Sequence, residues 1–155
     1  MIPSRKIILV STDFSDVANQ AIQHAYADVD PGGEVHLIHV IEHQDQPNPL
    51  YAHYSTDELN NPDKRKEVAA KVEAELTALI PSDTGGKSVE TKVGAVFHPH
   101  VAEGILKEAS ERKADGIVVG SHGRSALSQL LMGSVAETVL RGSNLPVLIV
   151  PHKKQ

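Results

Sequence analysis

Short apolar runs alternate with longer amphipathic stretches along the whole chain. Four of the runs, residues 6–10, 35–41, 116–120 and 146–150, are almost wholly apolar, which is typical of strands buried on both faces. In a fifth segment, residues 88–93, apolar and polar residues alternate, which predicts a strand with one solvent-exposed face at an edge of the sheet. The pattern therefore predicts five strands.

Between the predicted strands, apolar residues recur at spacings of three and four, the period of a helix packed on one face. Residues 31–33 (PGG) end the first helix, and Asn61 followed by Pro62 is a typical helix start. Residues 42–56 hold two prolines and many polar groups, so they are predicted to form a loop. The four helical segments are marked by Ala18, Ala21, Ile22 and Ala25; by Val68, Val72, Leu76 and Ile80; by Val101, Ile105 and Ala109 after Pro99; and by residues 133–140.

Strands that alternate with helices predict an α/β fold, in which an open sheet of five parallel strands carries helices on both faces. The length of 155 residues fits a single domain, residues 1–155, with no internal repeat. Ligands of such sheets bind beyond the carboxyl ends of the strands, where the strand order reverses. We therefore expect a binding site where the first strand, residues 6–10, and the fourth strand, residues 116–120, end.

Composition narrows the environment and the classes of partner. The chain has no cysteine, which excludes disulfides and cysteine-bound zinc and fits a reducing, cytoplasmic location. It opens without signal-peptide features and has no apolar run near the ~20 residues that cross a bilayer, so no membrane insertion is expected. A net charge of −5, two Phe, three Tyr and no Trp argue against nucleic-acid binding. A small anion is still a suitable ligand, because backbone N–H groups bind phosphate without any lysine.

The segment after the fourth strand, residues 120–135 (GSHGRSALSQLLMGSV), has the features of a phosphate site. Gly120 and Gly123 lack a Cβ, so the backbone can turn tightly there and bring N–H groups against a ligand. Gly133 and Ser134 begin a helix, where free N–H groups and the positive end of the helix dipole favour an anion. An ordinary strand-to-helix connection with glycines at its turns is the alternative. Further donors are offered by Ser121, Ser125, Ser134 and Arg124.

The full spacing, Gly-x2-Gly-x9-Gly-Ser between an apolar strand and a helix, resembles the nucleotide signature of the universal stress protein family. The resemblance covers the whole chain: residues 6–22 (KIILVSTDFSDVANQAI) look like the first strand, acidic turn and first helix of the family. Residues 120–140 followed by 146–150 (PVLIV) look like its phosphate loop, last helix and last strand. The resemblance implies a Rossmann-like fold, similar to that of the adenine nucleotide alpha hydrolases, with the strand order 3-2-1-4-5, and it implies ATP with Mg²⁺ as the ligand.

The resemblance also assigns roles to particular positions. Asp13 matches the acid that contacts the nucleoside sugar and helps to hold Mg²⁺, and the backbone of Val40 matches the position that recognises adenine. Ser11 stands where many members carry proline, which alters the exit of the strand. The phosphate positions match Gly120, Gly123, Gly133 and Ser134, with the backbone of Val135. The complete set of expected cofactor contacts is Ser11, Thr12, Asp13, Val40, Val119, Gly120, His122, Gly123, Arg124, Gly133, Ser134 and Val135.

Several of these residues have a second interpretation. Asp13 is placed to cap the helix that follows it, although Ser15 can take that role and leave Asp13 for a ribose hydroxyl. His122 either bonds a phosphate or fills a solvated loop position. Tyr51 and Tyr54 either fold over the nucleotide or cover the core.

The nine histidines invite a metal interpretation, which we set aside. His98 and His100 flank Pro99, and neither this pair nor His36 with His39 has a carboxylate or cysteine at zinc-site spacing. We expect His98 to cap the third helix and the others to be surface or partly buried groups.

The last strand, Val147, Leu148, Ile149 and Val150, is apolar on both faces yet is expected at an edge of the sheet, which predicts that a second copy covers it in a homodimer. The family commonly pairs through this strand. The expected function is a nucleotide-dependent stress-response module with a regulatory protein partner of unknown identity. No catalytic residue is assigned; a slow ATP hydrolase and an ATP-independent stress protein are the alternatives.

Overall fold

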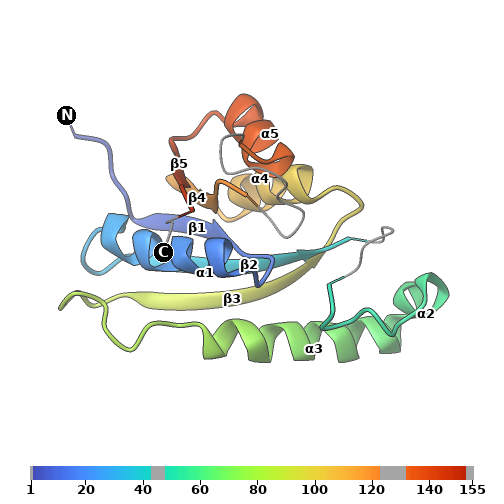
Figure 1. Cartoon of the computed structure of the whole chain (residues 1–155). Helices are drawn as coiled ribbons and strands as arrows, with labels where there is room; N and C mark the ends of the chain where they lie inside the picture. Colours follow the sequence, from blue (N-terminus) through green and yellow to red (C-terminus); the bar gives the residue numbers. More distant parts are fainter. Residues whose placement is uncertain (1, 43–47, 123–131, 153–155) are drawn as a thin grey trace.

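The computed structural model describes residues 2–42, 48–122 and 132–152 (Figure 1). Its five strands pair in parallel in the order β3-β2-β1-β4-β5, which confirms the predicted α/β fold and strand order. The chain leaves β1 towards β2 and β3 on one side, and returns to add β4 and β5 on the other, so the order reverses between β1 and β4. The strands are β1 (Ile7–Ser11), β2 (Glu34–Ile41), β3 (Glu90–Phe97), β4 (Gly116–Gly120) and β5 (Val147–Val150).

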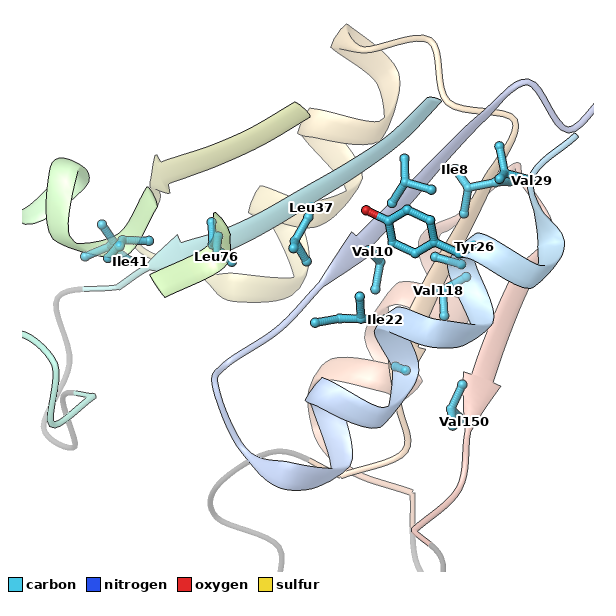
Figure 2. Close-up of a cluster of buried hydrophobic side chains, with 14 of the residues drawn as sticks. Ile8, Val10, Ile22, Tyr26, Val29, Leu37, Ile41, Leu76, Val118 and Val150 are labelled. Carbon is cyan, nitrogen blue, oxygen red and sulfur yellow. The ribbon is translucent and has the colours of Figure 1, made fainter. Parts of the chain in front are cut away.

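Helices cover both faces of the sheet, as the sequence predicts. The α1 and α3 helices pack on one face over a cluster that includes Ile22, Leu76 and Val118, drawn in Figure 2. The α4 and α5 helices pack on the other face over Leu9, Ile105 and neighbouring apolar residues (Figure 1). The helices are α1 (Asp16–Asp28), α2 (Thr56–Asn60), α3 (Pro62–Ala78), α4 (Val101–Glu111) and α5 (Ser134–Gly142).

Three details differ from the sequence prediction. The α2 helix was not predicted; it begins with a capping box in which the hydroxyl of Ser55 accepts from the N–H of Glu58 and the carboxylate of Glu58 accepts from the N–H of Ser55. The third strand is longer than predicted and continues to Phe97. The residue at the N-cap of α4 is His100, without a side-chain cap bond, and His98 does not cap the helix: its Nδ1 accepts the N–H of His100 at 3.0 Å.

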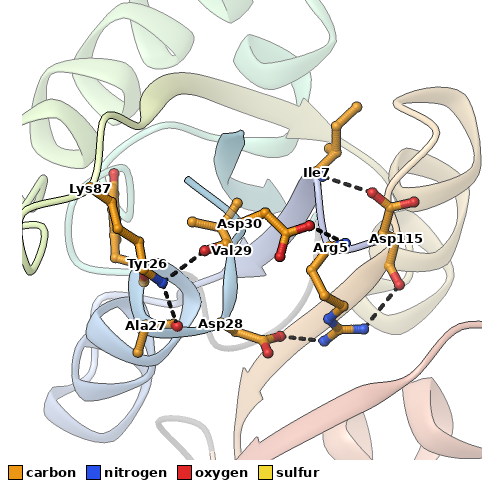
Figure 3. A network of polar contacts seen from close by, with 9 residues as sticks. All are labelled: Arg5, Ile7, Tyr26, Ala27, Asp28, Val29, Asp30, Lys87 and Asp115. Atoms are coloured by element: carbon orange, nitrogen blue, oxygen red, sulfur yellow. Dashed lines mark hydrogen bonds and ion pairs between the residues drawn. The ribbon is translucent and has the colours of Figure 1, made fainter. Parts of the chain in front are cut away.

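Polar groups at the amino ends of the central strands satisfy one another (Figure 3). The guanidinium of Arg5 pairs with the carboxylate of Asp28 and donates to the carbonyl of Asp115 at 3.2 Å. Lys87 Nζ donates to the carbonyl of Val29 at 2.8 Å, at the end of α1, whose last turn holds no basic residue of its own. A lysine there stabilises the negative end of the helix dipole. This end of the sheet is therefore closed by internal contacts.

Candidate functional site

The turn between β1 and α1 lies at the carboxyl edge of the sheet and is built by local hydrogen bonds. The hydroxyl of Thr12 donates to Asn19 Oδ1 at 2.7 Å and accepts the N–H of Phe14 at 3.0 Å. Asp13 Oδ1 accepts the N–H of Ser15 at 3.0 Å. Phe14 has a φ of 68°, in the left-handed region that a bulky residue rarely adopts. The turn thus holds a strained residue directly after Asp13.

The helix α1 begins as one of the two sequence interpretations predicts. Ser15 is the N-cap, and its hydroxyl accepts the N–H of Ala18 at 3.3 Å. The carboxylate of Asp13 does not cap the helix, but it is not left free either, since it closes the turn through Ser15. Asp13 is half-buried at the end of the strand.

Side chains from β2 and the segment after it reach across to this turn. His39 Nδ1 lies 2.7 Å from the carbonyl oxygen of Thr12, and His39 Nε2 lies 2.9 Å from the hydroxyl of Tyr51. Asn48 Nδ2 donates to the carbonyl of Asp13 at 2.8 Å. These three side chains are buried, with His39 and Tyr51 only 3% and 2% exposed.

One expectation from the sequence changes here, and one of two open alternatives agrees with the packing. His36 and His39 are both buried, not surface or partly buried groups, and each is hydrogen-bonded. Tyr51 packs in the core cluster, and Tyr54 packs against it, so both cover the core. Sequence reasoning gave no role to Asn48 or His39 in the site, because their partners lie 35 and 27 residues away along the chain.

The exit of β4 forms the second half of the same edge. The main-chain N–H of Gly133 donates to the carbonyl of Ser121 at 2.7 Å, which brings the start of α5 to the end of β4. Gly133 is the N-cap of α5 and makes no side-chain cap bond. The first two residues of the helix, Ser134 and Val135, are exposed. The start of this helix is therefore accessible.

His122 stands out in this half of the site. Only 8% of the residue is exposed, and its Nδ1 lies 3.0 Å from the hydroxyl of Ser121. Its Nε2 is buried without a hydrogen-bond partner, one of two such side-chain nitrogens in the described part of the chain; the other is His152 Nδ1. A buried polar atom left without a partner destabilises a protein by about 1–3 kcal/mol, so it needs an explanation.

Glycine 120 has a structural role in addition to any role at a ligand. A Cβ at this position would lie 3.2 Å from the Cα of Ala18 and 3.3 Å from a methyl carbon of Val17. Helix α1 therefore approaches β4 as closely as it does because residue 120 has no side chain.

The structure brings together part of the predicted set. Because β1 and β4 are neighbours, with Val10 paired to Val118, the exits that carry Asp13 and His122 lie on adjacent strands, as predicted. Val40 and Val119 are 3% exposed and belong to the core cluster under α4 and α5, so any contact with a ligand would be through the backbone. Gly123 and Arg124 lie outside the described residues. The other predicted residues at this edge are Ser11, Thr12, Gly120, Gly133, Ser134 and Val135.

Metal ligands do not cluster in the described part of the chain. Within residues 2–42, 48–122 and 132–152, no group of three or more His, Asp or Glu side chains is placed to hold a metal ion. Glu42, the first residue after β2, is a half-buried acid: burial raises its pKa, with His100 acting in the opposite direction.

A parallel sheet with helices on both faces defines a doubly wound α/β protein, and ligands of such proteins generally bind beyond the carboxyl ends of the strands, where the strand order reverses. The sequence model of the universal stress protein family matches residues 4–151, and the chain belongs to that family. No helix in the described ranges is long and apolar enough to cross a membrane.

Individual relatives agree with this assignment. A universal stress protein of Methanocaldococcus jannaschii is 35% identical, and the match covers 96% of each chain. A solved structure of that same protein, described there as hypothetical, is 33% identical with a TM-score of 0.64, covering 97% of this chain and 99% of its own. A universal stress protein in complex with cAMP is 24% identical with a TM-score of 0.58, covering 97% and 99% of the two chains.

Proposed function

We propose that this chain binds ATP with Mg²⁺ at the carboxyl edge between β1 and β4, and that occupancy of this site regulates a stress response. The observation that carries the proposal is the buried, unpartnered Nε2 of His122 beside the uncapped start of α5. Among the described residues, Nε2 of His122 has no partner and the N-cap of α5 makes no side-chain bond, and the bond from the N–H of Gly133 to the carbonyl of Ser121 brings the helix start to the residue before His122. A ligand with several anionic oxygens satisfies both Nε2 and the helix start.

The electrostatics of the helix start favour phosphate in particular. The first N–H groups of a helix have no partner within the helix, and they form the positive end of its dipole. Here the N-cap is a glycine without a side-chain acceptor, and the residues after it are exposed. An anion at such a helix end needs no lysine.

The remaining roles follow the position of each residue at this edge. We assign the carboxylate of Asp13 to the ribose and to Mg²⁺, and the backbone at Val40, near the end of β2, to adenine. Mg²⁺ is bound in proteins by one or two carboxylates together with phosphate oxygens, which fits Asp13 after β1 and the lack of a protein-only cluster among the described residues. The ion supplies charge neutralisation for the phosphates. That one structural relative was solved with cAMP supports an adenine nucleotide for a protein of this fold.

Isothermal titration with MgATP, MgADP and AMP tests the proposal, and His122→Ala is the informative variant. Hydrogen bonds to charged groups contribute about 1.5–3 kcal/mol, so loss of Nε2 should weaken ATP about tenfold to a hundredfold. His24→Ala is the matched control, because His24 is exposed on α1. No heat with any nucleotide, or equal ATP affinity for His122→Ala and His24→Ala, would contradict the proposal.

We further propose that a second copy of this chain covers the outer edge of β5. This strand pairs with β4 on one side, and Leu148 in its centre is 40% exposed. An apolar edge strand is an aggregation hazard unless something covers it. Wild-type protein should sediment as a dimer at micromolar concentration and Leu148→Lys as a monomer; a monomeric wild type would refute this.

The absence of cysteine fits the proposed cytoplasmic location of a single-domain protein.

A further inference from the structure

We infer that His39, Tyr51 and Asn48 are positioning residues for the nucleotide site: they fix the main chain on both sides of Asp13 without contacting the nucleotide. The inference rests on the proposed function, and it assigns to these side chains a role that their place in the sequence does not suggest. They lie at the end of β2 and in the segment that follows, whereas the turn they hold follows β1.

The contacts converge on two consecutive carbonyl groups. His39 Nδ1 holds the carbonyl of Thr12 at 2.7 Å, and Asn48 Nδ2 holds the carbonyl of Asp13 at 2.8 Å. The N–H of Thr12 donates to the carbonyl of Ile38 at 3.0 Å, which continues the β1–β2 ladder to the same point. The peptide groups that flank the Asp13 side chain are therefore fixed from β2 and from the segment after it.

The turn needs such support because it is strained. Phe14, with a φ of 68°, occupies a conformation that destabilises a non-glycine residue by about 1–3 kcal/mol and persists only when its surroundings determine it. The ring of Phe14 lies 4.8 Å from the ring of His39, centroid to centroid, so the same histidine contacts the strained residue and the carbonyl before Asp13. Without these contacts the turn is free to relax, and the Asp13 carboxylate moves with it.

The hydrogen-bond directions are fixed by chemistry. A carbonyl oxygen only accepts, so His39 Nδ1 carries the hydrogen; in the neutral ring, Nε2 then accepts from the hydroxyl of Tyr51. Asn48 is locked in turn, because its Oδ1 accepts the N–H of Leu50 at 3.1 Å. Buried polar groups linked in this way select one geometry, where apolar side chains would only fill the space.

A pair of tyrosine variants provides a matched test. Tyr51→Phe removes the hydroxyl that orients His39, and Tyr26→Phe removes the hydroxyl of a similarly buried tyrosine, bonded to Thr91 near the amino ends of the strands. Each variant loses one hydrogen bond made by a buried tyrosine, so the two should lose comparable stability. We expect ATP affinity to fall about threefold to tenfold in Tyr51→Phe and to be unchanged in Tyr26→Phe.

Two variants of His39 separate positioning from packing. The amide nitrogen of an asparagine occupies nearly the place of Nδ1, so His39→Asn keeps the donor to Thr12, whereas His39→Leu fills the space without a donor. We expect His39→Asn to retain most of the ATP affinity and His39→Leu to lose about tenfold or more. Equal affinities in these two variants would refute a positioning role and leave only packing.

Amide hydrogen exchange in the nucleotide-free protein supplies a readout that needs no ligand. The N–H groups of Phe14 and Ser15, which the turn protects, should exchange faster in Tyr51→Phe than in Tyr26→Phe. A wild type that binds no nucleotide defeats the proposed function. A wild type that binds, with the two tyrosine variants equal in affinity or in exchange, defeats this inference alone.

Discussion

Replacing Gly120 with alanine should destabilise the protein through α1, whatever it does to a ligand. The new Cβ would lie 3.2 Å from the Cα and 3.3 Å from the backbone N of Ala18, closer than the roughly 3.5–4.0 Å at which carbon atoms attract each other. The neighbour is helix backbone held by the Ser15 cap, so it cannot rotate away and must shift as a unit. Overpacking of this kind lowers the free energy of unfolding by about 1–3 kcal/mol.

Gly116, at the other end of β4, offers a control. An added Cβ there would make a shorter contact than at Gly120, but that contact should destabilise the protein less. A Cβ at Gly116 would lie 2.7 Å from the guanidinium nitrogens of Arg5, but these atoms end a flexible side chain that is 21% exposed. Arg5 can swing away, which loses a partly solvated ion pair with Asp28 worth about 1 kcal/mol or less and a hydrogen bond to the carbonyl of Asp115 worth about 1 kcal/mol. The Gly116→Ala variant should therefore be the more stable of the two.

Urea unfolding of both variants measures this difference directly. For a chain of this size, each kcal/mol should also lower Tm by about 2–4 °C. If Gly120→Ala unfolds like the wild type while its ATP affinity falls, the helix-packing argument is wrong and the glycine serves the ligand alone. If Gly116→Ala is the less stable variant, the distinction between backbone and flexible side-chain neighbours is wrong.

Three further variants test other parts of the fold. The pKa of Glu34 is lowered from the ordinary 4.5, mainly by its hydrogen bond with His36 and also by Lys92. The ionised carboxylate therefore stabilises the folded protein fully above pH 4.5. This stabilisation is lost as the pH falls through the lowered pKa of the folded state. Glu34→Gln should therefore flatten the acid limb of a plot of Tm against pH, and an unchanged limb would refute the assignment. Ser15→Ala removes the α1 cap and should lower the unfolding free energy by about 1 kcal/mol in urea titrations; a change near zero would show that the cap is unimportant. Leu76→Ala removes a fully buried side chain of α3 and should lower the unfolding free energy by about 2–5 kcal/mol. A smaller loss would show that neighbouring side chains move in to fill the cavity.

The architecture was predictable because its signals are local. Runs such as 6–10 and 116–120 are apolar on both faces, and only a covered parallel sheet buries such strands. The end of β3 was missed because the alternation stops at Gly94, after which three apolar residues follow in succession. The α2 helix was missed because five residues are too few to show a helical period; only the Ser55 and Glu58 pair marks its start.

The site was predictable in part, for a related reason. The Ser15 cap joins residues three positions apart, so residue type and spacing suffice to suggest it. The contact of Asn48 with Asp13 joins residues 35 positions apart, and nothing in the local sequence of either residue indicates it. We predicted the histidines of β2 near the surface because residue type alone does not show whether a residue far along the chain offers a buried hydrogen-bond acceptor. The carbonyl of Thr12 is such an acceptor for His39.

The two halves of the edge differ in a way that bears on how a ligand would be held. At the end of β1, the carbonyls of Thr12 and Asp13 and the N–H groups of the turn are satisfied within the protein, so this half is preorganised. At the end of β4, the described residues leave His122 Nε2 unpartnered and the start of α5 uncapped. A rigid half orients a ligand at little entropic cost, and an unsatisfied half gains hydrogen bonds when an anion arrives. This division fits the proposed placement of the sugar on the β1 side and of the phosphates on the β4 side.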